Sequence, residues 1–293
     1  MKKIIFKGCG TALVTPFTKD GVNFEELRKL IEFQILEGVD SLIICGTTGE
    51  SSTMSLEERK SVIKFAVSIA ARRVPIIAGT GGNNTQEAIK MSQYAESVGA
   101  SGLLIVTPYY NKTTQAGLVA HYSAIASSTK LPIIVYNVPS RTGVNIEPET
   151  CLALSKIENI VAIKEASGNI SQVAKIAALC KDDLFIYSGN DDQIIPILSL
   201  GGLGVISVLS NLYPKYVTCL VYDYFNGDTQ KACQSQLNAI ELINALFCEV
   251  NPIPVKYGLN HMGFDCGIPR LPLVELSDLG KDKLIHAIQQ FNY

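Results

Sequence analysis

Residues 160–168, Ile-Val-Ala-Ile-Lys-Glu-Ala-Ser-Gly, give the clearest indication of how this chain folds. Four apolar residues and a Ser-Gly turn signal predict a buried strand ending at Lys164, and the lack of polar alternation is typical of a parallel sheet. A lysine there either leaves the core or is desolvated, and a neutral desolvated amine is a nucleophile toward carbonyl carbon. Taken alone, the stretch favours a solvated Lys164, because lysines are seldom fully buried.

Seven further apolar runs repeat this pattern along the chain, and the segments between them have helical spacing of apolar residues. Eight strand–helix units predict an α/β fold, a (β/α)8 TIM barrel with a C-terminal helical extension. The alternative is a doubly wound open sheet, but the spacing is regular and no Gly-x-Gly-x-x-Gly follows the first strand. The expected strands are residues 11–17, 41–45, 75–78, 102–106, 132–136, 160–164, 184–187 and 204–208.

Helices are expected between these strands and after the last one. We expect a catalytic barrel over residues 1–211, whose last helix extends to about 225, and a C-terminal helical region over 212–293. Ser55 and Glu58 have the spacing of a helix-capping box. The expected helices are residues 23–37, 85–98, 115–127, 148–156, 171–180, 216–225, 229–246 and 277–291.

Charge and composition exclude several classes of protein. The 25 basic and 27 acidic residues leave a net charge of −2 without a basic stripe, which predicts no nucleic-acid partner. No apolar run approaches the roughly 18 residues of a membrane span, and the apolar run before Lys7 is too short for a signal peptide. We therefore expect a soluble, cytoplasmic protein. Its eight cysteines are expected to be free thiols, and its scattered histidines predict no metal site.

Barrel enzymes bind substrates at the carboxyl ends of their strands, and the reactive side chains of this chain follow those ends. The second strand is followed by residues 46–51, Gly-Thr-Thr-Gly-Glu-Ser. Such a turn either offers backbone N–H groups to an anion or uses glycine only for backbone freedom. It lacks the lysine of a nucleotide phosphate loop, so a carboxylate is the better candidate ligand.

Tyr136 and Lys164 end neighbouring strands of the predicted sheet, which are about 4.8 Å apart. If both side chains point inward, the phenol can exchange protons while the amine adds to a carbonyl. The alternative is a core tyrosine with a satisfied hydroxyl. Arg141 follows in Pro-Ser-Arg-Thr-Gly and suits bidentate binding of a carboxylate, although a lone arginine is most often a surface residue.

With these residues the chain strongly resembles the dihydrodipicolinate synthase (4-hydroxy-tetrahydrodipicolinate synthase) family of the pyruvate-dependent class I aldolase superfamily. The similarity extends over nearly the whole chain. The lysine and the Tyr-Asn-Val-Pro sequence are shared across the superfamily, whereas the Ser-Arg-Thr-Gly continuation is more specific to the synthases. The matching motifs are GTTGES at 46–51, TPYYN at 107–111, YNVPSRTG at 136–143, IKEA at 163–166, GVIS at 204–207 and NPIPVK at 251–256.

The resemblance implies which residues are catalytic. Lys164 is implied to form a Schiff base with pyruvate. Thr47, Tyr136 and Tyr110 are implied to relay protons, with Tyr110 reaching in from a neighbouring subunit. The implied assembly is a homotetramer, built as a dimer of tight dimers, and the enzyme is a lyase that needs no metal and no organic cofactor.

The resemblance also implies how the substrates are held. The backbone of Thr47 and Thr48 binds the pyruvate carboxylate, and Arg141 binds the carboxylate of aspartate semialdehyde. Gly189 and Ile206 line the pocket through their backbones. The implied reaction condenses the pyruvate enamine with L-aspartate 4-semialdehyde, then releases a cyclic product of lysine and diaminopimelate biosynthesis through transimination by the substrate amine.

Feedback inhibition by lysine is predicted to be weak or absent. Lysine-inhibited members bind lysine at the dimer interface through a Ser-Ala…His…His pattern together with Asn, Glu and Tyr. The positions that match here are Ser51, Asn83, Glu87 and Tyr109. The two histidine positions hold Leu56 and Arg59, and Arg59 adds positive charge where a cationic ligand would lie.

Two other functions fit parts of this pattern. An N-acetylneuraminate lyase or a keto-deoxy sugar-acid aldolase of the same superfamily shares Lys164 and Tyr136 but usually lacks Ser-Arg-Thr-Gly. A non-catalytic barrel that only binds keto acids has no need for a desolvated lysine beside a phenol. Glu50 is expected to anchor its turn through hydrogen bonds, whereas the sequence assigns no role to Asp191.

Overall fold

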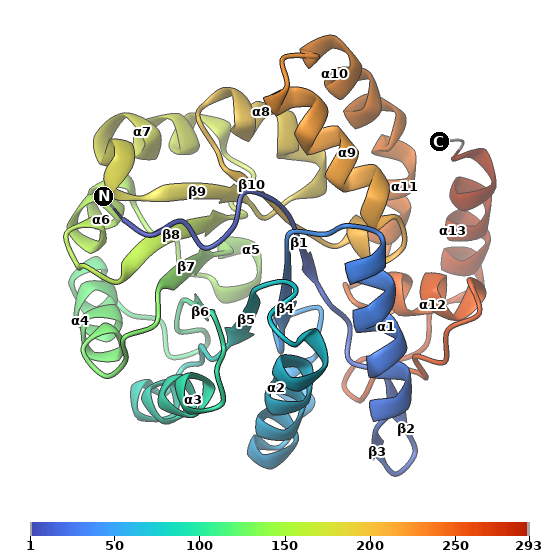
Figure 1. Ribbon diagram of the computed structural model, residues 1–293, viewed down its shortest axis with the longest axis horizontal. Coiled ribbons are helices and arrows are strands. Elements are labelled where there is room, and N and C mark those ends of the chain that lie inside the picture. Colours follow the sequence, from blue (N-terminus) through green and yellow to red (C-terminus); the bar gives the residue numbers. More distant parts are fainter. Residues whose placement is uncertain (1, 292–293) are drawn as a thin grey trace.

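The computed structural model describes residues 2–291, which form a closed barrel of eight parallel strands with helices around it (Figure 1). The first strand pairs with both the second and the last strand of the barrel, and this pairing closes the sheet. The predicted barrel is confirmed, and the open-sheet alternative is wrong. The barrel strands are β1 (Gly8–Ala12), β4 (Ser41–Ile44), β5 (Ile76–Gly79), β6 (Gly102–Val106), β7 (Ile133–Asn137), β8 (Ile160–Glu165), β9 (Phe185–Ser188) and β10 (Gly204–Ser207).

The first barrel strand lies earlier in the chain than predicted. We expected a strand over residues 11–17, but β1 covers Gly8–Ala12. The reason is steric, because a Cβ on Gly10 would lie 2.8 Å from the Ile43 side chain and 2.9 Å from the Phe6 ring. A strand packed this closely needs glycine. Because glycine has a low strand propensity, the sequence pattern did not predict a strand here. The chain beyond β1 instead reaches a short hairpin of β2 (Phe17–Thr18) and β3 (Gly21–Val22).

Helices cover the outer face of the barrel (Figure 1). The helix over Pro214–Phe225, α9, packs against β1 and β10 and closes the ring. The predicted capping box at Ser55 is confirmed, because Ser55 and Glu58 exchange both hydrogen bonds. The division after residue 211 remains a prediction. The helices around the barrel are α1 (Phe24–Leu36), α2 (Leu56–Ala70), α3 (Thr85–Ser97), α4 (Gln115–Ala126), α6 (Pro148–Ser155), α7 (Ile170–Cys180), α8 (Ile194–Ser199) and α9.

The chain after α9 is helical, as expected, but its helices differ in detail. The single helix expected over 229–246 is wrong, because the helix is interrupted at Ala239. No proline or glycine lies at this position to predict the interruption. A further helix at 253–261 begins beside two prolines, which the first turn of a helix tolerates. Figure 1 shows these helices gathered on one side of the barrel. They are α10 (Thr229–Asn238), α11 (Ile240–Leu246), α12 (Ile253–His261) and α13 (Asp278–Gln290).

The barrel interior is filled at its amino-terminal end. The Phe6 and Tyr187 rings stack there with centroids 4.4 Å apart, and the Tyr187 hydroxyl donates to the Phe6 carbonyl. Apolar side chains such as Ile77 and Ile134 complete this inner core. Barrel enzymes bind their ligands at the opposite end, where the strands finish.

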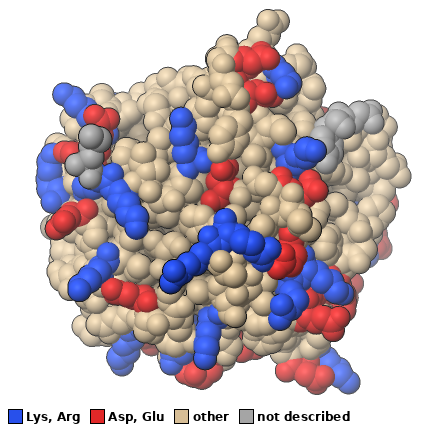
Figure 2. Space-filling model, viewed as in Figure 1, with Lys and Arg blue, Asp and Glu red and all other residues tan. Residues whose placement is uncertain are grey.

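The surface and the cysteines agree with the composition. Basic and acidic side chains are interleaved over the face shown in Figure 2. All eight cysteines are free thiols, as expected. Within residues 2–291, no helix is both long and apolar enough to span a membrane, and no group of three or more His, Cys, Asp or Glu side chains could hold a metal ion.

Candidate active site

Lys164 lies at the carboxyl end of β8, and its side chain is buried inside the barrel with 5% exposure. The strand register pairs it with Tyr136 of β7, and Lys164 Nζ is 4.4 Å from the centroid of the Tyr136 ring. Within the described chain this nitrogen makes no hydrogen bond and no ion pair. The solvated lysine that the local sequence favours is therefore wrong, and the amine is buried beside a phenol.

The next residue on each strand holds this pair in register. Side chains alternate along a strand, so Asn137 and Glu165 face the opposite side of the sheet from Tyr136 and Lys164. Asn137 Nδ2 donates to both Glu165 oxygens at 3.2 and 3.1 Å, and Gln172 Nε2 donates to Glu165 Oε2 at 3.2 Å. No sequence motif indicated this buried network, which fixes the ends of β7 and β8.

The turn after β4 presents backbone amides to the same space. Glu50 N donates to the Thr47 carbonyl at 3.0 Å and Ser51 N donates to the Gly46 carbonyl at 3.5 Å, which closes the turn. The backbone amides of Thr47 and Thr48 donate no hydrogen bond within residues 2–291. Neighbouring free N–H groups form an anion-binding concavity, so this turn can hold a carboxylate.

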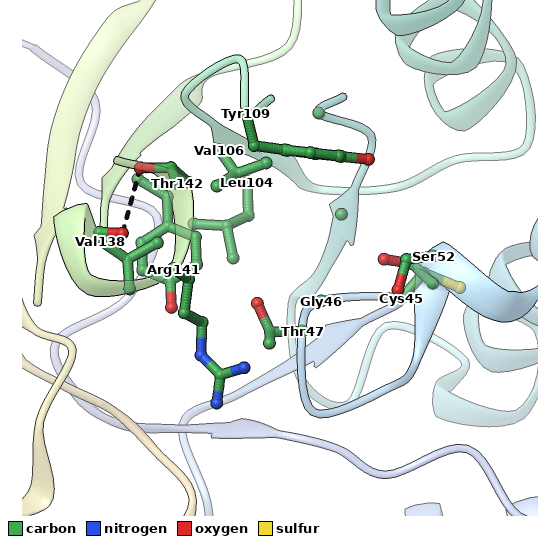
Figure 3. Close-up of a pocket in the computed structure, with 14 residues that line it drawn as sticks. Cys45, Gly46, Thr47, Ser52, Leu104, Val106, Tyr109, Val138, Arg141 and Thr142 are labelled. Atoms are coloured by element: carbon green, nitrogen blue, oxygen red, sulfur yellow. Dashed lines mark hydrogen bonds between the residues drawn. The ribbon is translucent and has the colours of Figure 1, made fainter. Parts of the chain in front are cut away.

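Two adjoining cavities lie at this end of the barrel. The inner cavity, about 200 Å³, is bordered by Lys164 and Thr48, and the outer cavity measures about 210 Å³. Thr47, Tyr136 and Arg141 border both cavities. In Figure 3 the side chains of Thr47 and Arg141 are directed into the same space from opposite walls. Arg141 comes from the short helix α5 (Pro139–Thr142), which directly follows β7.

Of the two residues predicted to line the pocket through their backbones, Gly189 borders a cavity and Ile206 does not. Gly189 borders the inner cavity, and a Cβ there would lie 3.1 Å from Lys164 Cε and 2.6 Å from Ala166 Cβ, so a larger residue would crowd the lysine. Ile206 is fully buried in the barrel core and does not border either cavity. Val208, two residues further along, borders the inner cavity instead.

Tyr110 is not joined to the other predicted catalytic residues within this chain. Its side chain is 93% exposed, and its backbone is left-handed with a φ of 69°. It borders neither cavity, although its neighbour Tyr109 borders the outer one. No hydrogen bond within residues 2–291 connects the Lys164 amine, the Tyr136 hydroxyl and the Thr47 hydroxyl.

The six residues predicted for a lysine-effector site are only partly gathered. Ser51 and Tyr109 border the outer cavity. Arg59 Nη2 donates to the Gly79 carbonyl at 3.1 Å, while Arg59 Nε is buried without a partner in the described chain. The residues of this set that do not border the cavity are Leu56, Arg59, Asn83 and Glu87.

Glu50 and Asp191 both anchor loops of the site. Glu50 Oε1 accepts from Lys256 Nζ at 2.8 Å and Oε2 accepts from Arg270 N at 2.9 Å, which confirms the expected structural role. Asp191 Oδ2 accepts from the amides of Val208 and Leu209, both at 2.9 Å. Burial raises the pKa of Asp191, while these amide hydrogen bonds oppose that shift. Asp191 thus holds the loop that carries one wall of the inner cavity.

A barrel whose cavity holds a buried lysine beside a phenol, facing a turn with free amides, has the site of a Schiff-base-forming class I aldolase. Residues 5–291 match the model of the dihydrodipicolinate synthetase family. The chain belongs to that family.

Individual relatives agree with this assignment over nearly their whole length. The 4-hydroxy-tetrahydrodipicolinate synthase 1 of Clostridium acetobutylicum is 57% identical over 274 residues, which cover 94% of each chain. A 4-hydroxy-tetrahydrodipicolinate synthase of Clostridium perfringens is 58% identical with the same coverage. The crystal structure of the dihydrodipicolinate synthase of Thermotoga maritima is 43% identical and superposes with a TM-score of 0.96, covering 98% of this chain and 99% of that one.

Proposed function

We propose that this chain condenses pyruvate with L-aspartate 4-semialdehyde, the reaction of a 4-hydroxy-tetrahydrodipicolinate synthase, through a Schiff base on Lys164. The observation that carries this proposal is the buried Lys164 amine, which has no hydrogen bond within residues 2–291 and lies 4.4 Å from the centre of the Tyr136 ring. Such an amine is not held in a direct ion pair within residues 2–291 and has a proton donor and acceptor beside it.

In the first half of the reaction, pyruvate binds with its carboxylate at the free amides of Thr47 and Thr48. Lys164 Nζ attacks the keto carbon, the carbonyl oxygen takes up protons and leaves as water, and an imine forms. Tyr136 and Thr47, which border both cavities, move these protons. Loss of a proton from the pyruvate methyl group then gives the enamine.

In the second half, the enamine carbon attacks the aldehyde carbon of the semialdehyde. A carbon–carbon bond forms, and the aldehyde oxygen takes up a proton. The substrate amine next attacks the imine carbon and expels Lys164, which releases the cyclic product and restores the free lysine. Arg141, at the border of both cavities, binds the carboxylate of this second substrate. The product belongs to lysine and diaminopimelate biosynthesis.

We also propose that the enzyme is a cytoplasmic homotetramer, a dimer of tight dimers, in which Tyr110 acts in the site of the neighbouring subunit. A tyrosine that is 93% exposed on a left-handed backbone is strained and unpacked within one chain. Its position next to Tyr109, at the edge of the outer cavity, suits a residue that completes the site of a partner. The eight free thiols suit a reducing compartment.

Trapping the imine tests the central step. The protein is incubated with pyruvate, reduced with borohydride and digested, and the modified peptide is mapped by mass spectrometry. We expect a pyruvyl adduct on Lys164 and none in Lys164→Arg, while Lys175→Arg on the exposed face of α7 keeps the adduct. An adduct on another lysine, or none, would overturn the proposal and favour a barrel that only binds keto acids.

Arg141 separates the proposed reaction from that of a sugar-acid aldolase. In Arg141→Ala the Lys164 adduct should still form, while turnover of aspartate semialdehyde falls by about one to two orders of magnitude, because a charge-assisted hydrogen bond of roughly 1.5–3 kcal/mol is lost. Sugar aldehydes tested beside the semialdehyde should be poor substrates. Preference for a sugar aldehyde would contradict the proposed second substrate and leave the Schiff-base mechanism intact.

A further inference from the structure

Asn251 joins two parts of the site that lie far apart in the sequence. Its Nδ2 donates to Thr48 Oγ1 at 3.0 Å, and its main-chain carbonyl accepts from Arg141 Nη2 at 3.3 Å. The residue is 5% exposed and borders the inner cavity. One residue of the C-terminal helical region thus contacts both elements that we propose for binding the substrate carboxylates.

The turn that carries Thr48 is attached to the same region at a second point. Lys256, in α12, forms its buried ion pair with Glu50, two residues after Thr48. The Glu50 amide in turn donates to the Thr47 carbonyl at 3.0 Å. Bonds on both sides of the turn restrict the rotation of its peptide planes, and therefore the direction of its free amides.

We infer that Asn251 is a positioning residue for substrate binding, and this inference rests on the proposed function. Its side chain holds Thr48 so that the free amide faces the pyruvate carboxylate, and its carbonyl holds Arg141 toward the second substrate. These two contacts come from different atoms, so a side-chain substitution removes the first and leaves the second. The expected effect is therefore selective for pyruvate.

Two variants test this selectivity. Asn251→Ala removes the contact to Thr48, and Asn251→Asp keeps the shape but brings a negative charge beside the turn. We expect the pyruvate concentration for half-maximal borohydride trapping to rise about tenfold in Asn251→Ala, which corresponds to a lost hydrogen bond of about 1.4 kcal/mol, and further in Asn251→Asp. The KM for aspartate semialdehyde and the kcat at saturation should change far less. Asn238→Ala, an exposed asparagine of α10, is the matched control.

A double-mutant cycle identifies the route of the effect. Because Asn251 acts through the Thr48 hydroxyl, Thr48→Val combined with Asn251→Ala should weaken trapping no more than the stronger single change. The inference would be overturned if both Asn251 variants needed the same pyruvate concentration as wild type for half-maximal trapping, or if the two changes in the cycle were fully additive. If Asn251→Ala does not fold, the isosteric variant Asn251→Asp provides the test of the inference. Failure of the wild-type protein to form the Lys164 adduct would instead overturn the proposed function itself.

Discussion

Glu50 and Lys256 form an ion pair in which both side chains are almost fully buried, with 2.8 Å between Lys256 Nζ and Glu50 Oε1. Burial lowers the pKa of Lys256, and the Glu50 carboxylate opposes that shift. The Lys256 ammonium also lies 4.3 Å from the centre of the Phe17 ring. The pair joins the turn after β4 to α12, so the C-terminal region supports a wall of the inner cavity.

Breaking this pair on one side should be severe. Lys256→Met leaves a buried carboxylate without its cation, so we expect the free energy of unfolding to fall by about 3–5 kcal/mol. The double variant Glu50→Gln with Lys256→Met should recover much of that loss. Denaturant unfolding measures both effects, and Lys281→Met, from an exposed ion pair of α13, serves as the control with no measurable change. Equal losses in the single and double variants would contradict this account.

Tyr136→Phe should leave the fold intact and slow the chemistry. The ring packing beside Lys164 is kept, but the proton donor and acceptor is lost, so we expect kcat to fall by about 10²–10⁴-fold. Tyr94→Phe is a matched control, because the Tyr94 hydroxyl donates to the Lys60 carbonyl between α3 and α2, outside the barrel. Steady-state turnover and the rate of borohydride trapping report the effect. A Tyr136→Phe enzyme with wild-type rates would remove Tyr136 from the proton relay.

Two inactive chains should restore activity when they are mixed, if Tyr110 acts in the partner's site. Tyr110→Phe lacks the donated hydroxyl and Lys164→Arg lacks the nucleophile. In a mixed dimer, the site with Lys164 receives Tyr110 from the other chain. Random mixing makes half of the dimers mixed, with one good site in two, so about a quarter of wild-type activity should return after joint refolding. Absence of any recovery would place Tyr110 in its own chain's site or outside catalysis.

Lysine should inhibit this enzyme weakly or not at all. Ser51 and Tyr109 border the outer cavity, but the positive charge of Arg59 is held nearby through its bond to the Gly79 carbonyl. Turnover measured against rising lysine concentration should stay near its starting value. The double variant Leu56→His with Arg59→His should be more sensitive to inhibition by lysine than wild type. Arg72→His, at an exposed position just beyond α2, is the control. Strong inhibition of the wild-type enzyme at physiological lysine concentrations would overturn this prediction.

Glu58 should make stability depend on pH in the acid range. Its hydrogen bonds with Arg270 lower the pKa of the Glu58 carboxyl to about 2. A folded-state pKa below the unfolded one, about 4.3, stabilises the fold above that value, and the stabilisation is lost as pH falls toward 2. Glu58→Gln keeps the capping partner of Ser55 but not the charge. We expect wild type to lose about 1 kcal/mol more than this variant between pH 5 and 2, after allowance for solvent screening.

Chemical unfolding at a series of pH values measures that difference. Glu57→Gln, at an exposed neighbouring position, should follow the wild-type pH dependence. Parallel curves for wild type and Glu58→Gln would show that the bonds between Arg270 and Glu58 do not link folding to protonation.

The barrel and much of its site could be predicted from the sequence, because both rest on local patterns. Continuous apolar runs indicated buried parallel strands, and parallel strands must end at the same rim. Tyr136 and Lys164, as the terminal residues of consecutive runs, were therefore placed together correctly. The first strand was misplaced because Gly8 and Gly10 are required by the packing of Phe6 and Asp40, which local propensity does not contain.

The support of these residues comes from contacts that only the folded chain brings together. The ion pair of Glu50 with Lys256 and the bond of Thr48 to Asn251 span more than two hundred residues, and no local pattern predicts which polar groups will meet in the core. Burial of Lys164 also followed only from the fold: the local sequence favoured a solvated side chain, and a strand-end lysine is buried only when the closed barrel surrounds it. Local sequence patterns were enough to indicate which reactive side chains are present and at which rim they lie, whereas the folded barrel settled which of them are buried and what holds them in place.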